Sequence, residues 1–126
     1  MDMKYKYMAL FFHTISMWKN EIIAIETDEF KQLLLGFIMN YYLSNRELMN
    51  EIFDIKYQEG KGFTYRIDYK EVEKYGCLLY DEPRKFCQLY DEVGDEKVKE
   101  ITDLACLFCQ YVEIIDDMNN NVRIRH

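Results

Sequence analysis

Apolar residues recur at spacings of three and four through most of this sequence, and little interrupts them. The chain has 126 residues, with one proline and five glycines. Such a period with so few chain breakers favours long helices over the short strands of a β-sandwich. Hydrophobic residues make up 49% of the chain, enough for one core. We therefore predict a mainly α protein, a compact bundle of about five to six helices, forming a single globular domain over residues 1–126.

Three helices are predicted in the N-terminal half. The first covers residues 4–26, with one apolar face formed by Met8, Phe11, Phe12, Ile15, Trp18, Ile22 and Ile25. Thr27 or Asp28 caps the second helix. Gly36 costs that helix about 1 kcal/mol relative to alanine, which indicates close approach of another helix. Residues 44–47 fit a capping box that opens the third helix, with Ser44 as the cap and Glu47 reaching back.

The C-terminal half carries three further helical segments. Residues 72–79 have a helical period. Pro83, tolerated in a first helical turn, opens the next helix, and Gly94 ends it. Asp95 caps a last long helix that runs to about Met118, and we expect the three asparagines that follow to form a loop.

One segment breaks the helical pattern. In residues 63–69, Phe63, Tyr65, Ile67 and Tyr69 alternate with polar residues, which predicts a half-buried strand. A lone strand is not stable, so this one needs a partner. The candidates are residues 122–125, residues 22–25 and a second chain.

The charge of the chain limits its partners. Asp and Glu number 23 against 16 Lys and Arg, giving a formal net charge of −7, and no basic run appears. Proteins that bind nucleic acid directly need clustered cations to displace counterions from phosphates, so we expect no direct nucleic-acid binding. The acidity suits solubility, or attraction to a basic partner.

Targeting signals are weak. Lys4 and Lys6 precede an uncharged stretch over residues 7–18, but no small-residue cleavage site follows it. The uncharged stretch over residues 32–45 is too short to span a bilayer. We expect a cytoplasmic protein with no membrane association.

Four cysteines raise the questions of metal and redox chemistry. Cys106 and Cys109 have a C-x-x-C spacing, and Cys77 and Cys87 would be the other two ligands of a zinc site. The C-x-x-C pair lies in the middle of a predicted helix among apolar residues, whereas redox pairs begin a helix and zinc pairs form a tight knuckle. We expect reduced, mostly buried thiols, with no metal and no cofactor.

Catalytic motifs are absent from the sequence. His13 lies within the first predicted helix, and His126 is the last residue, so only His13 is placed to assist a nucleophile. The Asp-Glu pairs do not have the spacing of a calcium loop. We therefore assign no catalytic residue and expect a protein that is not an enzyme.

The tract from Tyr80 to Glu96 is the candidate partner-binding site. Tyrosine is enriched at binding hot spots, and flanking carboxylates would attract a basic protein. The residues assigned to this site are Tyr80, Asp81, Glu82, Tyr90, Asp91, Glu92, Asp95 and Glu96.

The leading functional hypothesis is a small acidic inhibitor or adaptor that masks a basic surface of a partner protein. Bacterial immunity proteins and phage anti-defence proteins have this physical character, an analogy of size and charge alone. Two alternatives remain open. One is a small helical enzyme or ligand-binding domain with a pocket between helices. The other is a structural homo-oligomer, such as a homodimer, joined through the strand at residues 63–69.

Overall fold

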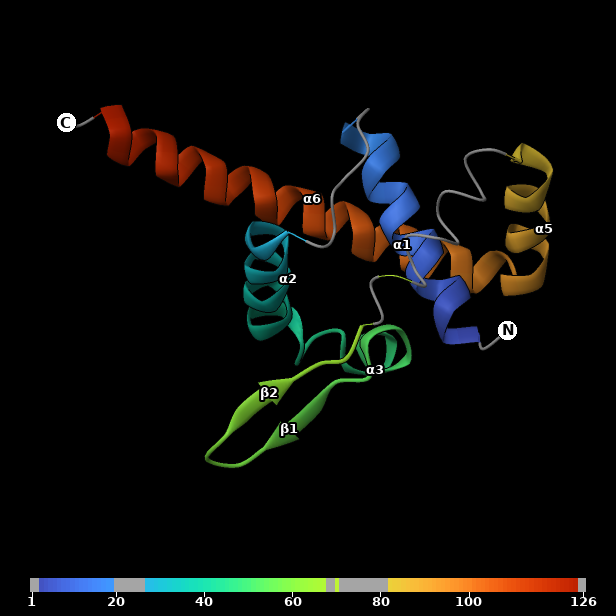
Figure 1. Cartoon of the computed structure of the whole chain (residues 1–126), viewed down its shortest axis with the longest axis horizontal. Helices are drawn as coiled ribbons and strands as arrows, with labels where there is room; N and C mark the ends of the chain where they lie inside the picture. The colour runs from blue at the N-terminus through green and yellow to red at the C-terminus, as the bar shows by residue number, and fades with distance from the viewer. Residues whose placement is uncertain (1–2, 20–26, 68–69, 71–81, 125–126) are drawn as a thin grey trace.

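The fold consists mainly of helices. The structure is a computed structural model, and it describes residues 3–19, 27–67, 70 and 82–124. Its elements there are α1 (Met3–Lys19), α2 (Asp28–Tyr41), α3 (Arg46–Phe53), β1 (Lys56–Gln58), β2 (Gly62–Thr64), α5 (Pro83–Val93) and α6 (Asp95–Ile124) (Figure 1). The five helices cover more than half of the chain, which confirms the predicted fold class. The predicted helix at 72–79 and the strand candidate at 22–25 lie outside the described residues.

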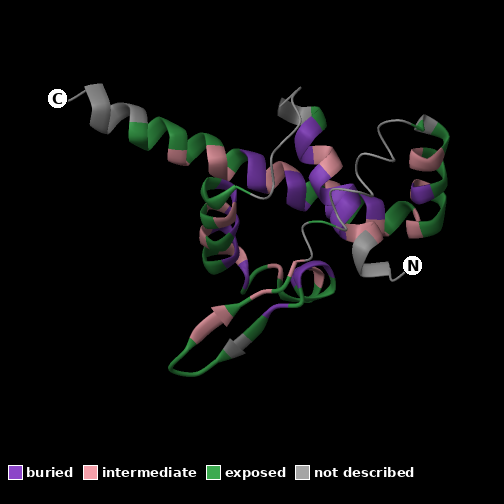
Figure 2. Cartoon of the chain, in the orientation of Figure 1, coloured by how far each residue is buried: buried purple, intermediate pink, exposed green. Residues whose placement is uncertain are grey.

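Helix α1 is the central element of the core. Every residue from Met8 to Phe12 is buried, so the helix is covered on more than one face. Helices α3, α5 and α6 all pack against it, α6 most extensively. Figure 2 shows the buried residues concentrated where α1 crosses α6. The single apolar face predicted from the sequence is therefore too narrow, since a helix that is apolar around most of its circumference belongs inside.

A cluster of phenylalanines joins four helices. The ring centroid of Phe108 in α6 lies 6.0 Å from Phe11, 5.7 Å from Phe30 and 5.2 Å from Phe37. Phe11 in turn lies 5.3 Å from Phe53 of α3, edge to face. All five rings are buried, and such tilted and edge-to-face arrangements are favoured by the ring quadrupoles. Phe108 thus connects α6 to both α1 and α2.

Two local predictions for α2 are confirmed. The Thr27 hydroxyl accepts a hydrogen bond of 3.3 Å from the backbone N–H of Phe30, as an N-cap should. A Cβ atom placed on Gly36 would overlap the hydroxyl of Tyr111 in α6. The glycine therefore allows α6 to approach α2 closely.

The capping box predicted for α3 is wrong. The helix starts at Arg46 with Asn45 as its N-cap, and no side chain caps it. The Asn45 amide instead donates a hydrogen bond of 3.1 Å to the carbonyl of Tyr41, at the end of α2. In the short turn between the two helices, the Asn45 side chain therefore bonds to the end of α2 and not to the start of α3.

A β-hairpin supplies the predicted strand with its partner. Strands β1 and β2 pair antiparallel, with Tyr57 opposite Phe63. Gly60 and Gly62 have φ angles of 85° and 82°, in the left-handed region that glycine adopts without strain. Of the strand predicted over residues 63–69, Phe63 and Thr64 belong to β2, residues 65–67 are not in a strand, and residues 68–69 lie outside the described part of the chain.

The proposed C-terminal partner for that strand is wrong, because residues 122–124 are helical. Helix α6 has 30 residues and does not end at the three asparagines, so the predicted asparagine loop is wrong as well. Asparagine is only a mild helix breaker, and neither glycine nor proline occurs within α6. At 1.5 Å per residue the helix is about 45 Å long, and its C-terminal part projects beyond the other elements (Figure 1).

The corner between α5 and α6 is tight. Pro83 occupies the first turn of α5, as predicted. The Gly94 N–H donates to the Tyr90 carbonyl at 3.0 Å, and the Gly94 carbonyl accepts from the Val98 N–H at 2.9 Å. One residue therefore ends α5 and begins α6.

Candidate functional site

Part of the predicted acidic tract gathers at the corner between α5 and α6. Four exposed carboxylates flank Gly94, and we call them the acidic corner: Asp91, Glu92, Asp95 and Glu96. Glu82 is also exposed, but it lies at the opposite end of α5, where it forms an ion pair of 3.3 Å with Lys85. Tyr80 and Asp81 lie outside the described residues.

Tyr90 contacts its own helix. Its ring is half-buried, and its centroid lies 4.9 Å from that of Phe86 in an edge-on arrangement. Phe86 in turn packs against His13 of α1, with ring centroids 4.4 Å apart. Part of the Tyr90 ring is therefore occupied by contacts within the molecule, and the rest remains accessible.

The helix dipoles act differently on the four carboxylates of the acidic corner. Asp95 and Glu96 lie in the first turn of α6, where a negative charge interacts favourably with the helix dipole. Asp91 and Glu92 lie in the last turn of α5, where the same charge is unfavourable, and no basic residue occurs in that turn. Glu92 is compensated by an ion pair with Lys6 of α1. The negative charge of Asp91 does not stabilise α5, so helix stability does not account for an aspartate at this position.

A groove between α3 and α6 was not predicted from the sequence. This α3–α6 groove has a volume of about 840 Å³ and is lined by α3, the turn before it and the first half of α6. Its carboxylates are Glu47, Glu51, Glu100 and Asp103, and its cations are Arg46 and Lys97. Four leucines also line it, Leu43, Leu48, Leu104 and Leu107.

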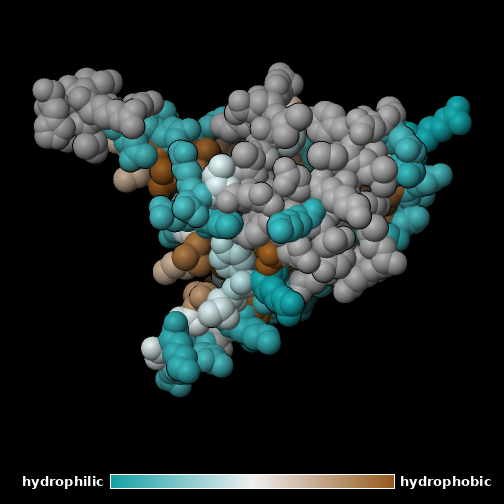
Figure 3. Space-filling model, viewed as in Figure 1, coloured by the Kyte–Doolittle hydropathy of each residue, from teal (hydrophilic) through white to brown (hydrophobic). Residues whose placement is uncertain are grey.

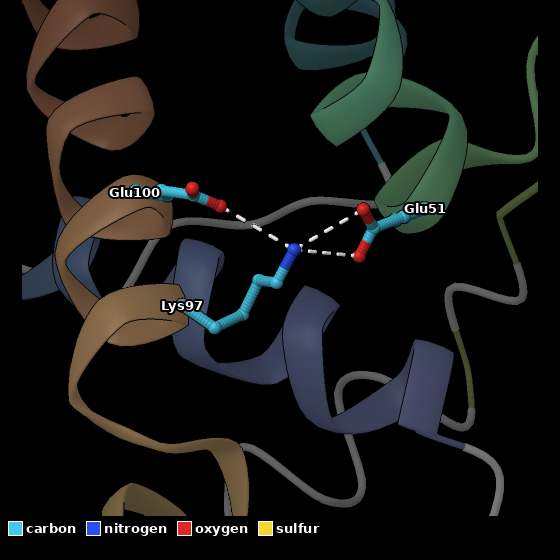
Figure 4. A network of polar contacts seen from close by, with 3 residues as sticks. All are labelled: Glu51, Lys97 and Glu100. Atoms are coloured by element: carbon cyan, nitrogen blue, oxygen red, sulfur yellow. Dashed lines mark hydrogen bonds and ion pairs between the residues drawn. The ribbon is translucent and has the colours of Figure 1, made fainter.

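Lys97 links the two walls of the groove through ion pairs. Its Nζ atom lies 2.9 Å and 3.1 Å from the two carboxylate oxygens of Glu51 on α3, and 3.3 Å from Glu100 on α6 (Figure 4). The hydrogen bonds that Lys97 donates to Glu51 are the main reason that the pKa of Lys97 is raised above its ordinary value, with a further contribution from Glu100. An ammonium held in this way stays protonated and is unsuited to act as a base or nucleophile.

Several large apolar side chains are exposed on α2, the turn after it and α6. They are Leu35 and Met39 of α2, Leu43, which also lines the groove, and Ile114 and Met118 of α6. Figure 3 shows hydrophobic atoms at the surface over α2 and over the adjoining part of α6. Apolar patches on soluble proteins often mark interaction sites.

The cysteines do not all behave as predicted. Cys109 is buried and Cys106 half-buried, but Cys87 is exposed, so the expected burial of the thiols does not hold for Cys87. Cys77 lies outside the described residues. Within the described part of the chain, no three His, Cys, Asp or Glu side chains come together as metal ligands.

His13 should make the fold sensitive to acid. Burial lowers its pKa below the ordinary value of 6.5. At a pH between the lowered pKa of His13 in the folded protein and its ordinary value in the unfolded chain, the unfolded chain binds more protons. The free energy of unfolding therefore falls as the pH drops below about 6.5. We expect His13→Gln to reduce the loss of stability between pH 7 and pH 5, measured by urea unfolding. An unchanged loss in the variant would show that other groups cause it.

None of the helices in the described ranges combines the length and apolar character needed to cross a membrane. No family model, curated protein or solved structure matches this chain.

Proposed function

We propose that this protein acts by binding another protein and masking a basic surface on it, as an inhibitor or adaptor of the immunity-protein or anti-defence kind. The acidic corner is the observation that supports the proposal. Four exposed carboxylates lie within six residues, and two of them, Asp91 and Glu92, oppose the dipole of their own helix. Such a concentration of charge weakens the fold slightly but speeds encounter with a cationic partner. Cys87 is exposed and free, which suits a reducing cytoplasmic location.

The first experiment is purification of the tagged chain from its native host, with mass spectrometry of what is bound. The proposal expects one protein partner with a basic contact surface. Its complex should form more slowly as the salt concentration rises, because ions screen the attraction between exposed charges. Recovery of the chain without a protein partner would contradict the proposal.

Asp91→Lys should weaken partner binding while raising the stability of the fold. The variant should associate with the purified partner several-fold more slowly at low salt, with the difference shrinking at high salt. Its free energy of unfolding should rise by about 0.3–1 kcal/mol, since a cation in the last turn of α5 interacts favourably with the helix dipole. Stopped-flow association and urea unfolding measure the two effects.

The matched control is Asp117→Lys, which makes the same change of charge on the exposed C-terminal part of α6. If both variants slow association equally, only the net charge matters and the acidic corner is not the contact. If Asp91→Lys leaves association unchanged, the corner has no part in encounter.

A small-ligand binding domain is the second candidate. The volume of the α3–α6 groove, about 840 Å³, lies within the range of about 300–1,000 Å³ that is usual for such sites. Native mass spectrometry of the protein from its host would reveal a bound small molecule as a discrete added mass. A homogeneous chain mass would reject this candidate.

A further inference from the structure

We propose that the α3–α6 groove receives a basic amphipathic helix of the partner protein. The inference rests on the proposed function and specifies the element that is bound. It follows from the apolar side chains of the groove, from its charge, and from the spacing of residues along α6.

Among the described residues, the most exposed large hydrophobic side chain borders this groove. Leu43 is 86% exposed; Leu48 on the same side of the groove and Leu107 on the α6 side are half-buried. A side chain bound in the groove could cover Leu43 and the exposed parts of Leu48 and Leu107 together. This part of the groove therefore suits an aliphatic or aromatic anchor from a partner.

The charge of the groove selects a cationic occupant. Four carboxylates line it against two cations. Lys97 is already paired with Glu51 and Glu100, while Glu47 and Asp103 are exposed and enter no ion pair among the described residues. A second copy of this chain, with a net charge of −7, has the wrong sign to fill the groove. Lysine or arginine side chains would complement it.

The geometry of α6 suits a helix rather than an extended segment. From Lys97 to Gln110 the groove follows α6 for about 20 Å, the length of about four helical turns. One face of α6 continues past the groove at spacings of three and four. Its residues are Glu96, Glu100, Asp103, Leu107, Gln110, Ile114 and Met118, all exposed except Leu107, which is half-buried.

That face of α6 changes character along its length. Its first three residues are acidic, whereas Leu107, Ile114 and Met118 in its second half are apolar. Spacings of three and four are those by which helices pack along one another. The bound helix should therefore be basic at one end and apolar at the other.

Synthetic peptides test this proposal directly. The probe is an 18-residue helical peptide with lysines in one half and a leucine face in the other. Its controls are the same peptide with glutamate for lysine, and one with proline at two central positions to prevent a helix. Fluorescence anisotropy at physiological salt gives each dissociation constant. The lysine peptide should bind at least about ten-fold more tightly than either control.

Variants of the protein locate the binding site. Leu43→Ser and Asp103→Lys should each weaken binding of the lysine peptide about ten-fold, and both side chains are exposed enough to leave the fold intact. The matched controls lie outside the groove: Met17→Ser on α1, where the side chain is 57% exposed, and Asp91→Lys at the acidic corner. These controls should change binding of the peptide less than about two-fold.

Equal effects of groove variants and controls would overturn the proposal, and so would equal binding of the proline peptide or no binding of the lysine peptide. The same four variants, tested against the natural partner, separate the two claims. If Asp91→Lys slows association but the groove variants do not, the groove inference fails and the proposed function stands. If no protein partner is recovered, the proposed function fails.

Discussion

Phe108→Ala is expected to lower the free energy of unfolding by about 3–5 kcal/mol. The ring is buried and contacts phenylalanines from α1 and α2, so its removal leaves a cavity lined by Phe11, Phe30 and Phe37. Rigid aromatic neighbours collapse poorly into such a space, which places the cost at the upper end of the range. Because domains of this size are stable by only about 5–15 kcal/mol, the variant should be close to unfolding at 37 °C. Urea and thermal unfolding measure the loss.

Phe63→Ala is the matched control. Its ring is half-buried on the hairpin and contacts Tyr42, with centroids 5.0 Å apart. The same chemical change there should cost about 1–2 kcal/mol, since less area is removed from contact. Similar losses for the two variants would mean that Phe108 is not at the centre of the core.

Gly36→Ala should change from destabilising to stabilising when the Tyr111 hydroxyl is removed. In the wild-type background the new methyl group overlaps that hydroxyl, an overpacking that costs about 1–3 kcal/mol and outweighs the helix propensity gained. In a Tyr111→Phe background, the nearest atom is the ring carbon that carried the hydroxyl, 3.5 Å away, an ordinary contact distance. There the alanine should stabilise α2 by up to about 1 kcal/mol.

A double-mutant cycle with urea unfolding gives the coupling energy between these two positions, expected at about 1–3 kcal/mol. The control is Gly60→Ala paired with Tyr111→Phe. Gly60 lies in the hairpin and has no atom of another residue within 4 Å of a placed Cβ, so no coupling should appear. A coupling energy near zero for Gly36 and Tyr111 would show that the Tyr111 side chain shifts to admit the methyl group without cost.

The features that the sequence predicted are those decided by neighbouring residues. Pro83 and Gly94 bound α5, and Thr27 caps α2, because each acts on the turn next to it. The hairpin partner of β2 was missed, since the three residues of β1 are too few to show an alternating pattern beside the end of α3. The burial of α1 on several faces depends on three other helices, which no pattern within α1 can report.

The same distinction applies to the candidate sites. The acidic corner was predicted because its four carboxylates are close in the sequence and only Gly94 separates the two helices. The groove was missed because its walls come from distant segments: Lys97 and Glu51 are 46 residues apart. One signal was present in the sequence, because Glu96, Glu100 and Asp103 recur at spacings of four and three on one face of α6.

The packing of α1 against α6 also constrains the order in which the chain can fold. Lys6 and Glu92, which form an ion pair, are 86 residues apart, and Phe11 meets Phe108 across a similar span. During synthesis, α1 leaves the ribosome well before α6, and the part of its surface that α6 covers cannot be buried until α6 has emerged. At about 5–20 residues per second, its apolar surface stays open for some seconds after it appears. Closing so long a loop makes folding slower than in a helical protein built of sequential hairpins.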